Sequence, residues 1–174
     1  MSGMQQMPTL TLPISLNEIG KEAMTNMKSM RILVKRGNTE MNCGEETIVF
    51  ETSETMKLYI SKEITKTTIC GRTVENTIEQ SDKSGENVDY ITTTKGELII
   101  YGEGKMNDYS SESVAPWKST STPTTSILID NGVTTIGSQT FNSINSLFTI
   151  IIAESVTTIG DLAFQTSGLK EIEI

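Results

Sequence analysis

A pentapeptide that recurs at a fixed offset constrains this chain more than any other feature. The string Val-Thr-Thr-Ile-Gly occupies residues 133–137 and again residues 156–160. Phe141 and Phe164 keep the same offset of 23 residues. Self-similarity at a period of about 20–50 residues is the signature of stacked repeats, in which one unit cannot bury its apolar face alone. The sequence therefore predicts a repeat architecture.

Each repeat unit combines a short strand with a segment of helical spacing. Apolar residues alternate at Ile150 and Ile152, which indicates a strand with one buried face. Residues 156–164 have roughly helical apolar spacing, but they are too short for a lone helix. Gly160 permits either close packing or an unusual dihedral angle at the turn.

Units of 22–23 residues built this way lie within the range of leucine-rich repeats, and their stacking buries a continuous core. The chain contains 21 Ile and 44 Ser plus Thr residues, which favours strands. We therefore predict an α/β repeat fold, strand-rich overall. We expect a leucine-rich-repeat solenoid with short strands and short helical turns, interrupted by a β-hairpin module.

A weaker third copy of the unit occupies residues 9–34. Ile19 and Gly20 match Ile136 and Gly137, and Met24 takes the place of the phenylalanine. Taken alone, residues 16–30 would indicate an amphipathic helix. The later copies favour a repeat unit instead.

The outward-facing strand positions are the candidate protein-binding residues, on the concave side of a leucine-rich repeat. The plainer reading is that any one of them merely faces solvent. A pair such as Glu171 and Glu173 could attract a cation or a basic partner, although a solvated acidic edge is the simpler interpretation. The candidate residues are Ser126, Leu128, Asp130, Thr149, Ile151, Glu171 and Glu173.

The middle of the chain breaks the repeat. Residues 47–50 and 56–60 are short runs of strand type, and residues 88–92 and 97–101 flank a Gly-containing turn, which indicates a β-hairpin. Residues 110–126 are rich in Ser, Thr and Pro and fit either an O-glycosylated stalk or an ordered loop. Trp117 within them favours an ordered loop that the indole anchors.

Two cysteines, Cys43 and Cys70, leave two interpretations open. They form a disulfide in an oxidising compartment, or they are two separate buried thiols. Their separation in the sequence does not give their separation in space, so the sequence does not decide between the two.

Composition argues against several kinds of chemistry. The chain has no His, which excludes His-based triads and His-ligated zinc, and two Cys cannot build a four-cysteine zinc site. A net charge of −8 disfavours nucleic acid as a partner. Gly102-Glu103-Gly104 lacks the third glycine of a phosphate-binding fingerprint, so no nucleotide is expected. We expect no enzyme activity, no metal and no cofactor.

The chain also shows no secretory signal and no membrane-spanning run. Its start has neither a basic nor an apolar segment of the kind a signal peptide needs, and no run approaches the ~18 apolar residues of a membrane helix. The last residues, up to Ile174, lie on a strand core, whereas a solenoid needs a polar terminal cap. We therefore expect a piece of a longer protein, with an exposed apolar end at residues 169–174 that tends to associate.

The repeats resemble a known family. Residues 155–164, SVTTIGDLAF, are similar to the unit of the BspA-like leucine-rich repeat of bacterial and protist surface antigens. Residues 85–117 resemble the hairpin module that often precedes such arrays, and residues 58–71 resemble the segment that closes an array in trichomonad-type members. The usual Cys after the Phe is absent, and Met24 replaces the usual Phe in the first unit.

This resemblance implies a division into three parts. Residues 1–70 would be the end of one array with degenerate β units, residues 71–125 a spacer and β-hairpin cap, and residues 126–174 the start of a second, truncated array. It also implies display at the cell surface or secretion, and adhesion to host or matrix proteins without catalysis. The alternative is a structural spacer in a surface protein, with no ligand of its own.

Overall fold

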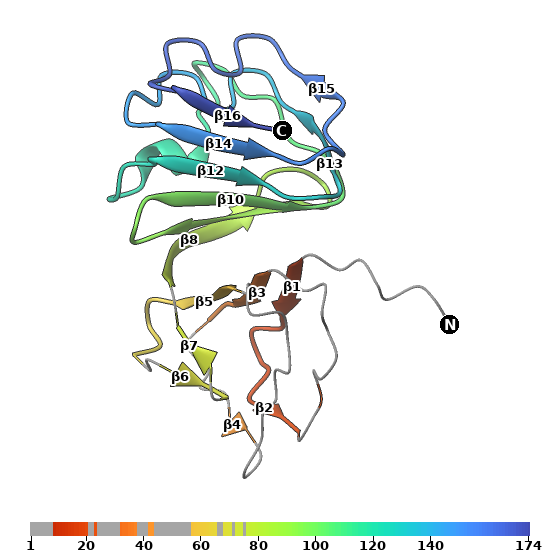
Figure 1. Cartoon of the computed structure of the whole chain (residues 1–174), viewed down its shortest axis with the longest axis vertical. Coiled ribbons are helices and arrows are strands. Elements are labelled where there is room, and N and C mark those ends of the chain that lie inside the picture. The colour runs from red at the N-terminus through yellow and green to blue at the C-terminus, as the bar shows by residue number, and fades with distance from the viewer. Residues whose placement is uncertain are drawn as a thin grey trace. The chain divides into compact units, whose positions relative to one another are not determined.

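Two compact units, residues 1–78 and 79–174, make up the chain, and we call them the N-terminal and C-terminal units. The computed structural model describes residues 9–20, 23, 32–37, 42–43, 57–65, 68–70, 72–74 and 76–174. Each unit is a strand-rich β-solenoid segment (Figure 1). The predicted strand at residues 47–50, together with Met24, lies outside the described residues.

The N-terminal unit stacks short parallel strands. The strands β1 (Thr9–Leu12), β3 (Ile32–Lys35) and β5 (Lys57–Ser61) pair in that order, and the first residues of β8 (Asn76–Lys83) pair with β5. Thr9 lies opposite Ile32, an offset of 23 residues that matches the C-terminal repeats. The weak copy at residues 9–34 therefore has the strand arrangement of a repeat unit.

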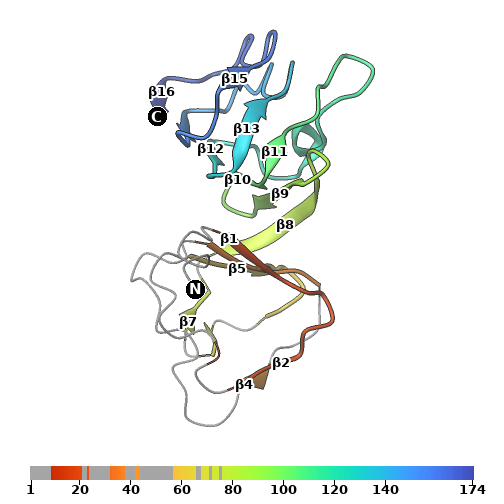
Figure 2. The same ribbon diagram turned by 90° about the vertical axis from the view of Figure 1, so that its right-hand side faces the viewer.

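Shorter strands complete this unit (Figure 2). β2 and β4 pair in parallel, whereas β6 and β7 pair antiparallel. Among the described residues of this unit, one buried cluster consists of aliphatic side chains from the longer and shorter strands and their turns: Leu12, Ile19, Leu33, Leu58, Ile60, Ile64 and Ile69. The four strands are β2 (Glu18–Ile19), β4 (Asn42–Cys43), β6 (Thr68–Ile69) and β7 (Arg72–Thr73).

A lysine occupies one core position of this unit. Lys35 lies opposite Leu12 and Ile60 and is fully buried. Its ammonium donates to the carbonyl oxygens of Ile14 and Arg36, both at 2.9 Å. Burial lowers the pKa of the Lys35 ammonium. The carbonyl oxygens offset part of the cost of burying the charge.

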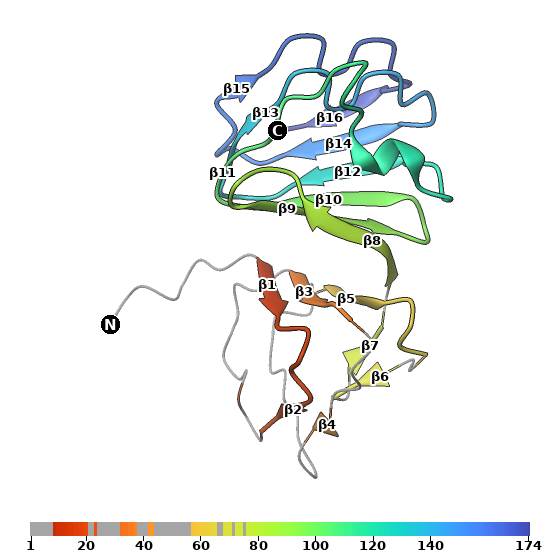
Figure 3. The ribbon, with the colours of Figure 1, turned by 180° about the vertical axis from the view of Figure 1, so that it is seen from behind.

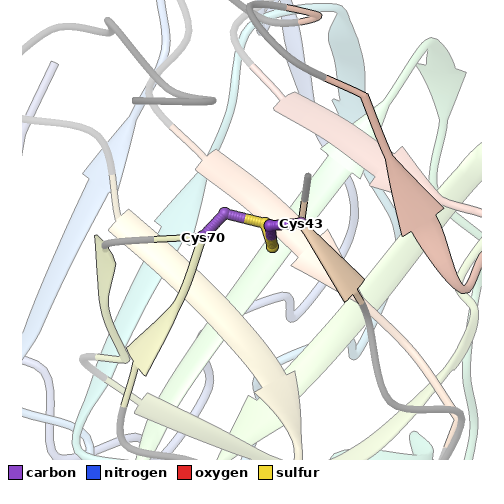
Figure 4. Close-up of a disulfide and its surroundings, with 2 residues drawn as sticks. All are labelled: Cys43 and Cys70. Carbon is purple, nitrogen blue, oxygen red and sulfur yellow. A yellow bond between two sulfur atoms is a disulfide. The ribbon is translucent and has the colours of Figure 1, made fainter. Parts of the chain in front are cut away.

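A disulfide joins two segments of this unit. Cys43 ends β4 and Cys70 follows β6, and the two are bonded with their Cα atoms 5.3 Å apart (Figure 4). This Cα separation is ordinary for a disulfide. Of the two interpretations that the sequence left open, the structure therefore supports the bonded pair.

The C-terminal unit has a larger and a smaller sheet, and residues of both contribute to one buried cluster (Figure 3). In the larger sheet, the order is the end of β8, then β9, β10, β12, β14 and β16. From β10 onward the strands are parallel, as in the first unit. These five strands are β9 (Val88–Thr93), β10 (Glu97–Gly102), β12 (Ser126–Ile129), β14 (Thr149–Ile152) and β16 (Glu171–Glu173).

The smaller sheet contains β11 (Gly104–Lys105), β13 (Val133–Ile136) and β15 (Thr158–Ile159). The repeated pentapeptides supply β13 and β15, and Ile136 lies opposite Ile159. We call each complete turn of the solenoid a coil. The coil that contains β15 covers Ile136, which is fully buried, whereas Ile159 of β15 is 52% exposed.

The expected hairpin lies inside the larger sheet. β9 and β10 pair antiparallel, and the amide of Gly96 donates to the carbonyl oxygen of Thr93 at 3.0 Å. Gly96 has a φ of +81°, which favours glycine at this turn. Since β9 lies beside β8 and β10 pairs with β12, the hairpin has strands on both sides. Its role as a cap is not confirmed.

Hydrogen-bonded turns replace the expected short helical turns, so the α/β character of the repeat is not confirmed. In the described residues the only helix is the 3-10 helix η1 (Pro116–Ser119). Gln139 and Leu162, one repeat apart, both have a left-handed φ near +55° (52° and 57°), which no α-helix tolerates. The amide of Phe141 donates to the carbonyl oxygen of Ala163 at 2.8 Å, and therefore to the next coil.

The glycine of each repeat is needed for close packing between coils. A Cβ at Gly137 would collide with the carbonyl of Asn107, and a Cβ at Gly160 would lie 2.6 Å from the amide nitrogen of Ser138. Neither glycine has a positive φ. Of the two roles that the sequence suggested for Gly160, the structure therefore supports close packing.

Replacing Gly137 with Ala is expected to lower the free energy of unfolding by about 1–3 kcal/mol, because the backbone of the preceding coil must move. Urea unfolding followed by circular dichroism measures this effect. Gly20 is the matched control, since it holds the same motif position and a Cβ there meets nothing within 4 Å. Equal losses for Gly137→Ala and Gly20→Ala would contradict the packing argument.

The Ser/Thr/Pro-rich connection is an ordered loop, as the tryptophan suggested. The indole nitrogen of Trp117 donates to the carbonyl oxygen of Thr140 at 3.1 Å. Lys118 donates to the carbonyl oxygen of Gln139 at 3.3 Å and to the side chain of Asn142, and burial lowers the pKa of Lys118. Both residues belong to η1 and attach this loop to the turn of the next coil.

Candidate functional site

The outward face of the larger sheet carries the residues that the sequence singled out. The strand register places Ser126 beside Thr149 and Thr149 beside Glu171. In the next row the order is Leu128, Ile151 and Glu173. β12, β14 and β16 lie side by side in Figure 1. We call these six residues the outward strip: Ser126, Leu128, Thr149, Ile151, Glu171 and Glu173.

Exposure along the strip rises toward β16. Ser126, Leu128 and Thr149 are half-buried, Ile151 is 41% exposed, and both glutamates are exposed. The intervening residues Ile150 and Ile152 point into the core and are buried. Strand periodicity therefore separates a core-facing set from an accessible set, and the accessible set is the predicted one.

Asp130 is the exception, and its predicted outward placement is wrong. Its side chain is fully buried, with 0% exposed. β12 ends at Ile129, so the alternation of the strand no longer applies to Asp130. Its carbonyl oxygen accepts a hydrogen bond from the amide of Val133 at 3.4 Å, which closes the corner toward the smaller sheet.

The sequence analysis did not single out one pair at the edge of the strip. Phe148 precedes β14 and is 46% exposed. The ammonium of Lys170 lies 5.5 Å from the centroid of its ring, within the range of a cation–π contact. Phe148 directly follows the core residue Leu147 in the sequence. This position could have indicated an exposed aromatic side chain at the edge of the strip.

An aromatic cluster supports the turns behind the strip. Trp117 packs edge-on against Tyr90 and Tyr109, with ring centroids 5.1 and 5.3 Å apart. Phe141 lies 5.9 Å from Trp117 and 5.3 Å from Phe164. Burial, with smaller contributions from the charges of Asp82 and Tyr109, raises the pKa of Tyr90 to about 12. The Tyr90 phenol is therefore neutral at physiological pH.

Other shifted groups hold loops in place. Burial tends to raise the pKa of Glu79, but the hydrogen bonds that it accepts from Thr122 and Ser121 lower the pKa overall. The amide of Ser121 lies 2.7 Å from the Glu79 carboxylate. The pKa of Asp108 is lowered chiefly by the backbone hydrogen bond from Ser138, at 2.6 Å. Through these hydrogen bonds Glu79 attaches the loop at Ser121, and Asp108 attaches its own loop to the coil that contains Ser138.

The outward strip is an accessible surface among the described residues. Among them, no group of three or more Cys, Asp or Glu side chains is placed to hold a metal ion. In the same part of the chain, no helix has the length and apolar character required to cross a bilayer. Ile151 and the two glutamates give the outward strip an exposed aliphatic side chain and negative charge.

Comparison with known proteins identifies the repeats. Residues 118–174 match the family model described as "BspA type Leucine rich repeat region (6 copies)". Among solved structures, a leucine-rich repeat protein from Eubacterium ventriosum is similar at 29% sequence identity with a TM-score of 0.51. The similarity covers 54% of this chain and 25% of that chain, so this chain spans about a quarter of that protein's length. No curated protein matches.

These matches agree with the coil geometry. The family model covers β12, β13, β14, β15 and β16, the strands that carry the pentapeptide repeats and the outward strip. Leucine-rich repeat proteins are generally binding modules without catalytic activity, and the family suggests a protein-interaction role. Residues 118–174 therefore match a BspA-type leucine-rich repeat region, and the chain is a strand-rich β-solenoid that is similar to a leucine-rich repeat protein.

Proposed function

We propose that this chain is a non-enzymatic adhesion module that binds host or matrix proteins through the outward strip. The observation that carries the proposal is Ile151, an aliphatic side chain 41% exposed on the outward face of a regular strand. Its neighbours in the register are Leu128 and Glu173. Aliphatic side chains that are accessible side by side and bordered by polar residues are typical of a protein-binding surface.

The proposal includes display at the cell surface or secretion. BspA-type repeats are typical of surface or secreted proteins. The disulfide between Cys43 and Cys70 supports an oxidising compartment, because reducing agents keep most cytosolic thiols free.

A binding array of extracellular-matrix and cell-surface proteins tests the proposal with the whole chain. We expect saturable binding to at least one protein, and a loss of about tenfold or more in Ile151→Lys, because a lysine there replaces the aliphatic contact. Leu128→Glu is expected to act in the same way, provided that circular dichroism is unchanged.

Val114→Lys is the matched control, because Val114 is 57% exposed on a loop outside the strip. This variant is expected to bind as the wild type does. Binding that Ile151→Lys leaves intact would refute the strip as the site. A well-folded chain that binds no protein on the array would instead support a structural spacer.

A further inference from the structure

The outward strip is acidic as well as aliphatic. Glu171 and Glu173 are exposed on the same face of β16, and Glu173 lies opposite Ile151. Glu97 of β10 begins the same row as Ser126, at the other side of the sheet. Parallel strands are about 4.8 Å apart, so the two ends of this row are separated by about 14 Å.

Basic residues are absent from this part of the sheet. The structure describes β10, β12, β14 and β16 in full, and these strands contain three glutamates and no Lys or Arg. Lys170 precedes β16, but its ammonium is placed over the ring of Phe148 at the edge. The strands of the strip therefore carry only negative charges, the net charge of the chain, −8, has the same sign, and Lys170 adds one positive charge at the edge.

Spacing along β16 adds a geometric condition. Glu171 and Glu173 are two residues apart on one strand, which places them about 7 Å from each other on the same face. Alternate side chains of any extended polypeptide have this same spacing. Two basic side chains separated by one residue would match the two carboxylates.

We propose that the outward strip binds a cationic polypeptide segment, in which two basic residues face Glu171 and Glu173 and an aliphatic residue covers Ile151. This inference rests on the proposed function and gives the chemistry of the partner. An acidic segment would be repelled by the same surface, so charge also sets specificity. The aliphatic contact excludes water beside the charge pairs and strengthens them.

The test uses two short synthetic peptides as probes. One carries two lysines and a leucine at alternate positions, so that the three side chains share one face of the extended peptide, and the other has two glutamates in place of the lysines. An NMR titration of the whole chain follows the backbone amides of β12 and β14. We expect the lysine peptide to shift these signals and the glutamate peptide to leave them unchanged. Raising the salt concentration is expected to weaken the binding of the lysine peptide, because salt screens exposed charge pairs.

The variant Glu171→Gln/Glu173→Gln is expected to bind the lysine peptide about three- to tenfold more weakly. The matched control is Glu112→Gln/Glu154→Gln, which removes two exposed carboxylates outside the strip. It changes the net charge equally and is expected to bind within about twofold of the wild type. All four glutamates are exposed, so these variants are expected to fold.

Three results would overturn the inference: equal losses in the two double variants, equal binding of both peptides, or no shift at the strip. Its failure is distinguishable from failure of the proposed function. Suppose that Ile151→Lys weakens binding to a protein on the array and that Glu171→Gln/Glu173→Gln does not. The strip would then remain a binding site, but the cationic partner would be refuted.

Discussion

Replacing Trp117 with Ala is expected to lower the free energy of unfolding of the C-terminal unit by about 3–5 kcal/mol. Trp117 is buried, contacts the rings of Tyr90, Tyr109 and Phe141, and donates its indole hydrogen to Thr140. Removing it leaves a cavity and an unpaired carbonyl oxygen. A loss of this size is a large part of the ~5–15 kcal/mol that stabilises an ordinary domain.

Urea unfolding followed by far-ultraviolet circular dichroism measures this loss, since Trp117 is the only tryptophan and its fluorescence disappears with it. Trp117→Phe is the matched variant. It keeps an aromatic ring but loses the hydrogen bond to Thr140, so we expect a smaller loss of about 1–3 kcal/mol. An alanine variant as stable as the wild type would show that the loop is not anchored by its indole.

Reduction of the disulfide between Cys43 and Cys70 is expected to destabilise the N-terminal unit by about 3 kcal/mol. The bond closes a loop with a sequence separation of 27, and such a closure restricts the unfolded chain. The unit spans only 78 residues, so the loss is expected to matter for folding at 37 °C. Thermal unfolding with and without a reducing agent measures it.

The double variant Cys43→Ala/Cys70→Ala is the control for this experiment. We expect it to unfold at the temperature of the reduced wild type and to be insensitive to the reducing agent. A wild-type chain whose unfolding does not respond to reduction would contradict a stabilising role of the bond. A thiol titration of the native protein, with no free thiol expected, checks that the bond is formed.

Repetition was the most informative signal in the sequence, because one offset sets the register of every strand that shares it. The recurrence of the pentapeptide predicted that β12 and β14 pair at an offset of 23 residues, and the structure confirms it. The alternation of aliphatic residues also separated Ile150 from Ile151 correctly. Both inferences rest on period and depend little on the chemistry of individual residues.

Backbone conformation at the turns could not be predicted in the same way. Helical spacing over residues 156–164 indicated a helical turn, but Leu162 adopts a left-handed φ of +57°. Leucine rarely adopts this conformation, so nothing in its identity indicates it. Packing between coils overrides the preference of leucine for a negative φ. This packing depends on the three-dimensional arrangement of the coils, which the local sequence does not give.

The burial of two polar residues also could not be predicted from the sequence. Lys35 occupies a core position because the carbonyl oxygens of Ile14 and Arg36 lie within its reach. Asp130 is buried because the strand ends one residue before it. In both cases a corner of the coil decides the environment, and period-2 alternation does not extend around a corner. The outward placement of the candidate residues was therefore predicted correctly along the strands and incorrectly beyond their end.

The hydrogen bonds that take the place of helical turns have a further consequence. Amides of Gln139, Phe141 and Ser143 donate to the carbonyl oxygens of Asp161, Ala163 and Gln165, all in the following coil. A coil taken out of the stack would have these donors unpaired. The repeated stretch of sequence is therefore not stable by itself. The energetic unit is the junction between two coils. Gain or loss of a whole coil leaves the remaining junctions unchanged, so such an array can change its length over evolution without a redesign of its core.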